Sequence, residues 1–131
     1  MSFSDYLEDK VLKHVFTNTA YTAPTTVYVG LFTAAPSDTG GGTEISTSST
    51  GYARQSAAFT VSGTSPTEAA NSSAIDFPTA TADWGSITHL AVFDAATGGN
   101  MLAFSAATTA KTINNGDILR IPAGSLEIRL D

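Results

Sequence analysis

Histidine is the side chain most often used as a general base, and His89 is the candidate base in this sequence. Such a base needs a carboxylate to orient it and a hydroxyl nucleophile within hydrogen-bond reach. The sequence offers the carboxylates of Asp83 and Asp94 and the hydroxyls of Ser86 and Ser105. Neither serine lies in the Gly-x-Ser-x-Gly pattern of a nucleophile elbow. We therefore interpret His89 as a strand histidine bonded to backbone or solvent, and we predict no catalytic residue.

Paired carboxylates are the second candidate chemistry, because glycoside hydrolysis uses two acids that face each other across a cleft. The candidates are Asp76, Asp83, Asp94 and Asp117. Each stands beside turn residues or at the end of an expected strand, where aspartate commonly caps or turns the chain. We interpret all four carboxylates as structural.

Metal and phosphate sites lack their sequence patterns. Residues 94–100 offer oxygen ligands, but they lack the alternating acids and the final glutamate of an EF-hand loop. The three glycines at 40–42 are not followed by the Gly-Lys-Ser/Thr of a phosphate loop. The sequence has no cysteine, which excludes disulfides, thiolate metal sites and cysteine nucleophiles. We therefore expect no metal and no cofactor.

The charge composition narrows the classes of partner. Among 131 residues, 6 Lys and Arg stand against 12 Asp and Glu, and the formal net charge is -6. This balance disfavours nucleic acid and anionic membrane surfaces, so we expect neither as a partner. No apolar run approaches the about 20 residues of a membrane-spanning helix. The N-terminus lacks the basic start and apolar stretch of a signal peptide, so we expect a protein made and kept in a cytoplasm.

The charged fraction itself is low. Only 14% of the residues are charged, whereas about 25% is usual in globular domains. A weakly charged surface is often covered by another molecule, so the composition favours a subunit of an assembly.

One helix is expected, over residues 3–16. Apolar residues recur there at four-residue intervals, with Tyr6 and Leu12 beside them: Phe3, Leu7, Val11 and Val15. This spacing places an apolar stripe along one face of a helix. Ser2, followed three residues later by Asp5, is the expected cap, and Asn18 and Pro24 end the helix.

The rest of the chain, residues 25–131, is expected to be β-rich. β-branched and aromatic runs separated by turn residues predict strands at 25–32, 52–61, 74–77, 87–93, 101–105, 118–121 and 126–130, with a weaker one at 109–113. Residues 27–32 and 90–93 are apolar on both faces, as in central strands. Residues 97–100 and 114–117 are expected to form hairpin turns.

Two polar stretches, residues 34–51 and 62–73, are expected to be long loops. They either lie across a neighbouring subunit or are mobile at the surface. Together these features predict a single domain over residues 1–131. Its fold class is mainly β, an antiparallel β-sandwich or small barrel with one N-terminal α-helix.

Several residues are candidates for an interface with another subunit. Arg54 follows the first long loop, and its planar guanidinium suits pairing with a carboxylate of its own chain or of a neighbour. Trp84 suits either the core, which we favour, or an interface pocket. The complete set of possible interface residues is Arg54, Tyr52, Trp84, Phe3 and Leu7.

Several segments resemble a known family. They are the helix with Tyr6 and Leu7, and residues 20–33, 51–55, 77–85, 93–100 and 121–124. Together they look like a family of small tailed-bacteriophage virion proteins, commonly labelled tail fibre or minor tail proteins. The resemblance covers nearly the whole chain. Its motifs are turn and strand patterns, so it gives no active-site residues.

The resemblance implies a non-enzymatic structural protein of a phage virion, made in the cytoplasm of the bacterial host. We expect it to be tail-associated, as a fibre-base, adaptor or baseplate component. Its partners would be other virion proteins and further copies of itself, as a trimer or higher oligomer. The main alternative is a capsid decoration protein on the phage head. A third hypothesis is a glycan- or receptor-binding module that uses Tyr21, Tyr52 and Trp84.

Overall fold

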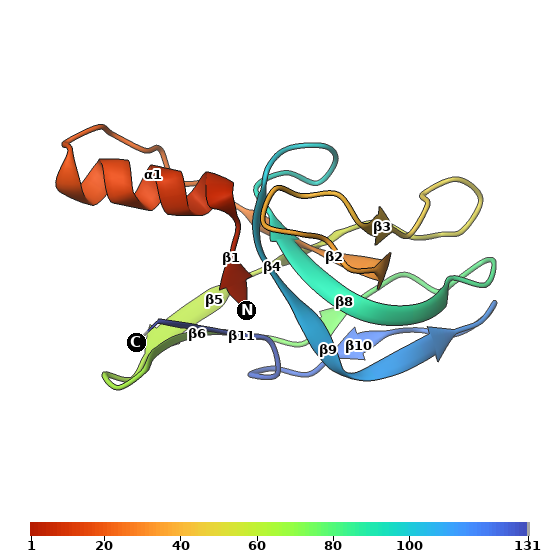
Figure 1. The fold of residues 1–131 in the computed structure, drawn as a ribbon. Coiled ribbons are helices and arrows are strands. Elements are labelled where there is room, and N and C mark those ends of the chain that lie inside the picture. The colour runs from red at the N-terminus through yellow and green to blue at the C-terminus, as the bar shows by residue number, and fades with distance from the viewer. Residues whose placement is uncertain (131) are drawn as a thin grey trace.

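The computed structural model describes residues 1–130 of the chain. Its largest sheet has β2 (Val27–Ala34) and β8 (Gly85–Phe93) at the centre, paired antiparallel. The order across this main sheet is β1 (Ser2–Phe3), β9 (Met101–Ile113), β8, β2 and β3 (Thr43–Glu44), and β4 (Gln55–Ala57) also pairs with β2. The apolar runs predicted to be central strands are therefore central (Figure 1).

Two smaller antiparallel sheets accompany the main sheet. One pairs β7 (Ile75–Asp76) with β10 (Arg120–Ile121). The other, here called the outer sheet, has the order β11 (Glu127–Leu130), β6 (Thr67–Asn71) and β5 (Phe59–Ser62). The mainly β antiparallel class is confirmed. Within residues 1–130 the sheets stay separate, so the small-barrel alternative is not realised.

The core explains why both faces of β2 are apolar. Val29 and Leu31 are fully buried and belong to the larger core cluster, together with Phe77 and Trp84. Phe32, the next residue after Leu31, points to the opposite face because side chains alternate along a strand. There it belongs to a second cluster of buried residues. Both faces of the main sheet are thus covered by apolar side chains.

The helix α1 (Asp5–Phe16) begins two residues later than predicted. Ser4, and not Ser2, caps it: the Ser4 hydroxyl accepts a hydrogen bond from the Leu7 amide at 3.3 Å and donates to the Met101 carbonyl at 2.5 Å. Ser2 and Phe3 instead pair with the edge of β9. At these two residues, hydrogen bonding to the free backbone groups of that edge is favoured over a further turn of helix. Asn18, in the left-handed region with φ 56°, follows the helix end as expected.

The polar stretch 62–73 was predicted to be a loop, and this is wrong. It contains β6, which pairs with β5 on one side and with β11 on the other. Asn71, at the end of β6, is buried and its side chain donates to the carbonyls of Ser73 and Pro122 and accepts from the Leu126 amide. Pairing on both sides therefore overrides the weak strand propensity of this segment. The stretch 34–51 is an irregular loop around the short strand β3.

Other strand boundaries also differ from the predictions. The expected strand 52–61 is divided at Ala58, because β4 pairs with the main sheet and β5 with the outer sheet. Residues 101–105 and 109–113 join into β9. Residues 97–100 do connect β8 to β9 as a hairpin. Residues 114–117 form a turn but no hairpin, because the strands that flank it, β9 and β10, pair with β8 and β7 instead.

Candidate functional site

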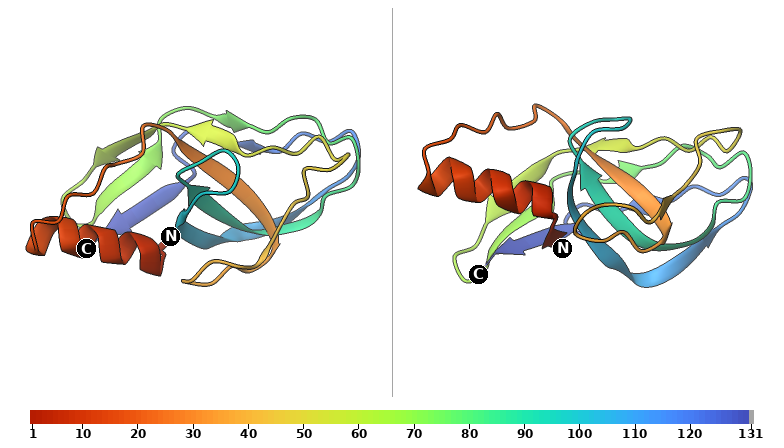
Figure 2. Two further views of the ribbon diagram at one scale, coloured as in Figure 1. Left: turned by 90° about the horizontal axis from the view of Figure 1, so that it is seen from above. Right: turned by 45° about the horizontal axis from the view of Figure 1, so that its top comes forward.

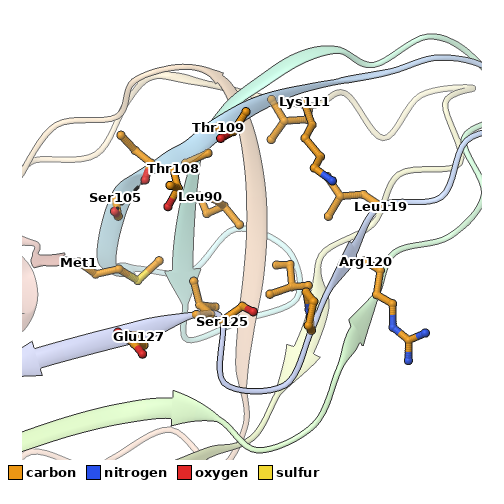
Figure 3. A pocket seen from close by; sticks show the side chains of 16 residues that line it. Met1, Leu90, Ser105, Thr108, Thr109, Lys111, Leu119, Arg120, Ser125 and Glu127 are labelled. Atoms are coloured by element: carbon orange, nitrogen blue, oxygen red, sulfur yellow. Dashed lines mark hydrogen bonds between the residues drawn. The ribbon is translucent and has the colours of Figure 1, made fainter.

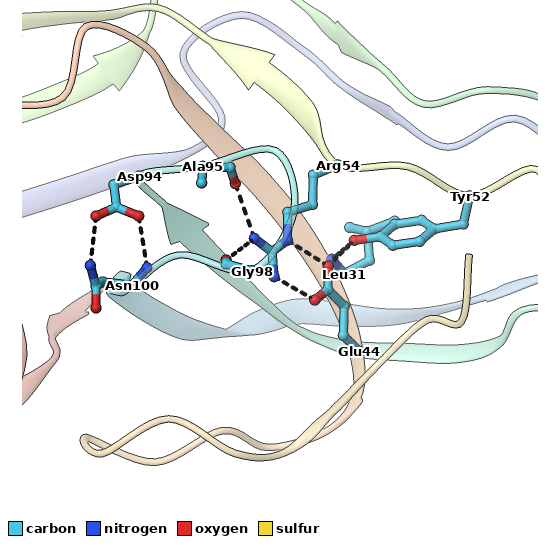
Figure 4. A network of polar contacts seen from close by, with 8 residues as sticks. All are labelled: Leu31, Glu44, Tyr52, Arg54, Asp94, Ala95, Gly98 and Asn100. Atoms are coloured by element: carbon cyan, nitrogen blue, oxygen red, sulfur yellow. Dashed lines mark hydrogen bonds and ion pairs between the residues drawn. The ribbon is translucent and has the colours of Figure 1, made fainter. Parts of the chain in front are cut away.

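A buried ion pair connects the long loop to the segment before β4. The Arg54 guanidinium donates to both carboxylate oxygens of Glu44, from Nε to Oε2 and from Nη2 to Oε1, each at 2.8 Å (Figure 4). The Arg54 side chain is only 9% exposed and that of Glu44 is 23% exposed. Arg54 thus pairs with a carboxylate of its own chain, one of the two partners expected for it.

Arg54 also reaches the turn between β8 and β9. Its Nη1 donates to the carbonyl oxygens of Ala95 at 3.0 Å and Gly98 at 2.8 Å. The guanidinium lies over the Phe93 ring, with its central carbon 3.5 Å from the ring centroid. This cation–π contact is attractive and shields the guanidinium from water. A single side chain therefore links the long loop, the start of β4 and the β8–β9 turn.

Tyr52 completes this arrangement, which we call the polar clamp: Glu44, Tyr52 and Arg54. The Tyr52 hydroxyl donates to Glu44 Oε2 at 2.7 Å and accepts from the Leu31 amide at 3.0 Å. On this side of β2, β4 pairs as far as Val29 and β3 pairs from Phe32 onward, so the hydroxyl fills the gap between them. Burial, followed by the hydrogen bond to Glu44, raises the pKa of Tyr52 well above its ordinary value.

Removal of the Tyr52 hydroxyl should lower stability and change its pH dependence. We expect Tyr52→Phe to reduce the free energy of unfolding by about 1–3 kcal/mol, because the buried Leu31 amide loses its partner. The raised pKa keeps the hydroxyl protonated in the folded state, while the unfolded state ionises above about pH 10. Its stabilising contribution is therefore full below that pH and is lost as the pH rises.

Urea unfolding of both proteins between pH 8 and pH 11 measures this effect. The wild type should lose up to about 1.4 kcal/mol per pH unit above about pH 10 through this group. Tyr52→Phe should show a shallower decline. Tyr21, whose pKa is also raised by burial, is present in both proteins and cancels in the comparison. Equal slopes for the two proteins would contradict the role assigned to the Tyr52 hydroxyl.

Gly30 gives the polar clamp its space beside β2. A Cβ atom at this position would lie 3.0 Å from Glu44 Oε2, 3.2 Å from the Phe93 ring and 3.3 Å from the Tyr52 hydroxyl. We expect Gly30→Ala to lower the free energy of unfolding by about 1–3 kcal/mol through overpacking. Thermal unfolding checks this, with Ala53→Gly as a control change at an exposed position. A Gly30→Ala variant at least as stable as the wild type would show that the clamp has room to move.

The polar clamp is suited to holding structure. Both Glu44 oxygens and the Tyr52 hydroxyl are engaged within the chain, so none of these groups is free to bind a substrate. The sequence showed Arg54 but not Glu44 as its partner. The only available signal was that Glu44 is the one carboxylate between residues 39 and 67.

The candidate catalytic residues are held in separate local motifs. His89 lies in β8, as predicted, but its Nδ1 lies 2.9 Å from the side-chain hydroxyl of Thr88, a partner that was not among the expected backbone and solvent groups. Asp94 accepts from the backbone and side-chain amides of Asn100 at 2.7 and 2.9 Å, and Asp83 accepts from the Asn115 amide at 2.8 Å. These carboxylates order turns, as their sequence positions indicated.

The other two candidate carboxylates also have partners within the chain. Asp117 accepts from the Asn114 amide at 2.9 Å, and Asp76 pairs with Arg120 at 3.3 Å on the surface. In residues 1–130, no group of three or more His, Cys, Asp or Glu side chains is placed to hold a metal ion. Over the same residues, no helix has the length and apolar character needed to cross a bilayer.

A hollow of about 460 Å³ lies between β9 and the segment 119–127. Hydroxyl groups of Ser105, Thr108 and Thr109 line it together with Lys111 (Figure 3). Arg120 is also at its margin, but its guanidinium extends away from the other labelled side chains and pairs with Asp76. The hollow is open, and no cluster of convergent charged groups marks a ligand position in it.

A second hollow, of about 300 Å³, is almost entirely apolar. It lies where the main sheet and the outer sheet separate, next to the start of α1. We call it the apolar groove, and its principal lining residues are Phe3, Leu7, Val92, Leu102, Val61 and Leu130. Phe3 and Leu7, predicted as interface residues, thus lie in one surface feature.

The helix α1 leaves most of its apolar stripe uncovered. None of its residues is buried, and Leu12, Val15 and Phe16 are 56%, 62% and 77% exposed. All views in Figures 1 and 2 place α1 at the end of the molecule where the outer sheet lies. The stripe was predicted from its spacing, but the protein's own core does not cover it. Four of the seven exposed large hydrophobic side chains within residues 1–130 lie on this helix.

Comparison with protein families adds to this geometry. The sequence model of the family described as podophage GP4 fiber I protein gp80 matches residues 2–129. The chain belongs to this fiber I family. The match includes α1, the polar clamp and all of the outer sheet except Leu130. No curated protein matches the chain.

The fold places the predicted interface residues of this fiber I protein in two environments. Tyr52 and Trp84 are 3% and 5% exposed and belong to the core, and Arg54 is held in the polar clamp. Phe3 and Leu7 line the apolar groove. Of the five predicted interface residues, Phe3 and Leu7 therefore remain candidates for a contact with another subunit. Burial also leaves no ring face of Tyr52 or Trp84 open for stacking on a sugar.

Proposed function

We propose that this fiber I protein is a non-enzymatic structural component of a phage tail, which acts by oligomeric assembly with other virion proteins. The match to the fiber I family over residues 2–129 carries the proposal. The chain has no internal repeat of the kind that builds an extended shaft. We therefore favour a fibre-base, adaptor or baseplate position over the shaft of a fibre.

The structure supports assembly as the mode of action. The carboxylates that resembled catalytic residues are engaged in turns or in a surface ion pair, and His89 lies beside the Thr88 hydroxyl, whereas the uncovered surface on α1 and in the groove is apolar. Contiguous apolar surface on a folded protein commonly marks a contact with another protein. A subunit that acts by assembly needs a stable fold and an exposed apolar surface that can contact a partner, and residues 1–130 have both.

Immunogold labelling of intact particles of the phage that encodes the chain tests the proposed position. An antibody raised against the purified protein should label the tail. Labelling confined to the capsid shell would overturn the tail assignment and favour the decoration alternative. Particles that lack the protein serve as the labelling control.

A further inference from the structure

The exposed large hydrophobic side chains of residues 1–130 are concentrated at one end of the molecule. Six of the seven lie on α1 or on the outer sheet: Val11, Leu12, Val15, Phe16, Val61 and Leu130. The seventh, Ile118, belongs to neither element. Two of the six, Val61 and Leu130, line the apolar groove, and the other four lie further along α1 than Leu7, which lines the groove from the start of the helix.

Few contacts within the chain hold α1 in this position. A helix of 12 residues is marginal in water unless one of its faces is packed, and no residue of α1 is buried. The chain anchors the first turn through the Ser4 cap and the pairing of β1 with β9. Tyr21 adds two contacts on another side of the helix: its amide donates to His14 Nδ1 at 3.1 Å, and its ring lies edge-on to Tyr6. None of these contacts covers Leu12, Val15 or Phe16, which stay exposed on the second half of the helix.

We propose that α1 of one copy packs its apolar stripe into the apolar groove of a second copy. The inference rests on the proposed function, in which the chain works as an oligomer. One chain carries both the uncovered helix face and the uncovered groove, so a second copy covers both in equal numbers. A different partner would have to supply two unrelated apolar surfaces to achieve the same result.

The area of this contact is adequate for a specific interface. A 12-residue helix is about 18 Å long and about 10 Å across, so half of its lateral surface is about 280 Å². If each copy buries its helix in the other's groove, each partner contributes a helix face and a groove, or about 560 Å². Standard interfaces bury about 800 Å² per partner. Over both partners the contact would bury about 1,100 Å², above the roughly 1,000 Å² expected of a specific interface. Val61 and Leu130, 68% and 57% exposed, are part of the groove surface counted here.

The oligomer mass gives the first test. The helix variant Leu12→Gln/Phe16→Gln changes two exposed residues, so its fold should be intact by circular dichroism. Analytical ultracentrifugation should show an oligomer for the wild type and for the control Ile118→Gln, which lies outside the groove. The helix variant should sediment with the mass of one chain. A monomeric wild type at high protein concentration, or a helix variant that stays oligomeric, would overturn the proposal.

Cross-linking tests the geometry directly, because the natural chain has no cysteine. Equal amounts of Leu12→Cys and Val61→Cys are mixed, allowed to exchange, and treated with a short bismaleimide linker. Intact mass spectrometry should reveal a mixed cross-link between the two variants. The control pair Leu12→Cys and Ile118→Cys should give at most a tenth of that yield. Absence of the mixed product would overturn helix-in-groove docking, even where the helices cross-link to each other.

These tests are independent of the particle labelling. A monomer in ultracentrifugation, together with tail labelling in particles, would reject the helix-in-groove contact and leave the proposed function standing. A specific mixed cross-link together with labelling on the capsid shell would support the helix-in-groove contact and reject the proposed tail position. The two failures are therefore distinguishable.

Discussion

Arg54→Ala is expected to lower the free energy of unfolding by about 3–5 kcal/mol. The substitution leaves the Glu44 carboxylate partly buried without its cation, and removal of one partner of a buried pair has a cost of this size. It also frees the carbonyls of Ala95 and Gly98 and uncovers the Phe93 ring. Chemical denaturation followed by circular dichroism measures the change.

Arg129→Ala is the matched control for Arg54→Ala. Arg129 also pairs with two oxygen-bearing side chains, Glu68 and Glu127, but it is 57% exposed. Exposed ion pairs contribute little, so we expect a loss below about 1 kcal/mol. A similar loss for both arginines would show that burial does not set the strength of the polar clamp.

The double variant Glu44→Gln/Arg54→Ala separates the cost of the unpaired Glu44 charge from the cost of the other contacts that Arg54 loses. It removes the uncompensated charge, so it should be more stable than Arg54→Ala alone. Residues in direct contact give non-additive effects of this kind. Strict additivity of the two single losses would mean that Glu44 and Arg54 act independently, contrary to their bidentate geometry.

Trp84→Ala is the second large expected loss, about 3–5 kcal/mol. The indole is 5% exposed, packs edge-on against Tyr52 with the ring centroids 5.5 Å apart, and donates from Nε1 to the Thr50 carbonyl at 2.8 Å. Its removal leaves a cavity in the larger core cluster, and the Thr50 carbonyl keeps only its hydrogen bond from the Thr81 amide. Thermal and urea unfolding followed by circular dichroism provide the measurement, since Trp84 is the only tryptophan.

Trp84→Phe and Ile118→Ala serve as the comparisons for Trp84→Ala. Trp84→Phe keeps most of the packing and loses the hydrogen bond, so its loss should be clearly smaller. Ile118 is 59% exposed, and Ile118→Ala should change stability by no more than about 0.5 kcal/mol. If Trp84→Ala kept full stability but lost oligomer formation, the residue would belong to an interface and not to the core.

Much of the fold was predictable because apolar patterning is a local signal. The two-sided apolar runs at β2 and β8 identified the central strands, and the four-residue spacing identified α1. The strand β6 was missed because Thr67–Asn71 has little propensity of its own. Its neighbours β5 and β11 supply the pairing, and β11 lies more than 50 residues away in the sequence.

The candidate sites were less predictable, and for different reasons. The pairing of Glu44 with Arg54 depends on how the long loop folds back toward β4, which no local pattern encodes. Amphipathic spacing showed that α1 has an apolar face, but spacing does not reveal what covers that face. Burial of Trp84 and exposure of Phe16 are properties of the three-dimensional packing, although both residues look equally apolar in the sequence.

The polar clamp has a consequence for how the chain reaches its native state. It joins Leu31, Glu44, Arg54 and Gly98, so it closes only after the central strand, the long loop and the β8–β9 turn have all met. Bringing such distant residues together costs loop-closure entropy, which slows folding. A misfolded conformer would bury an unpaired carboxylate or guanidinium and be disfavoured. Closure of the polar clamp therefore favours the native arrangement of these three segments over arrangements that leave either charge unpaired.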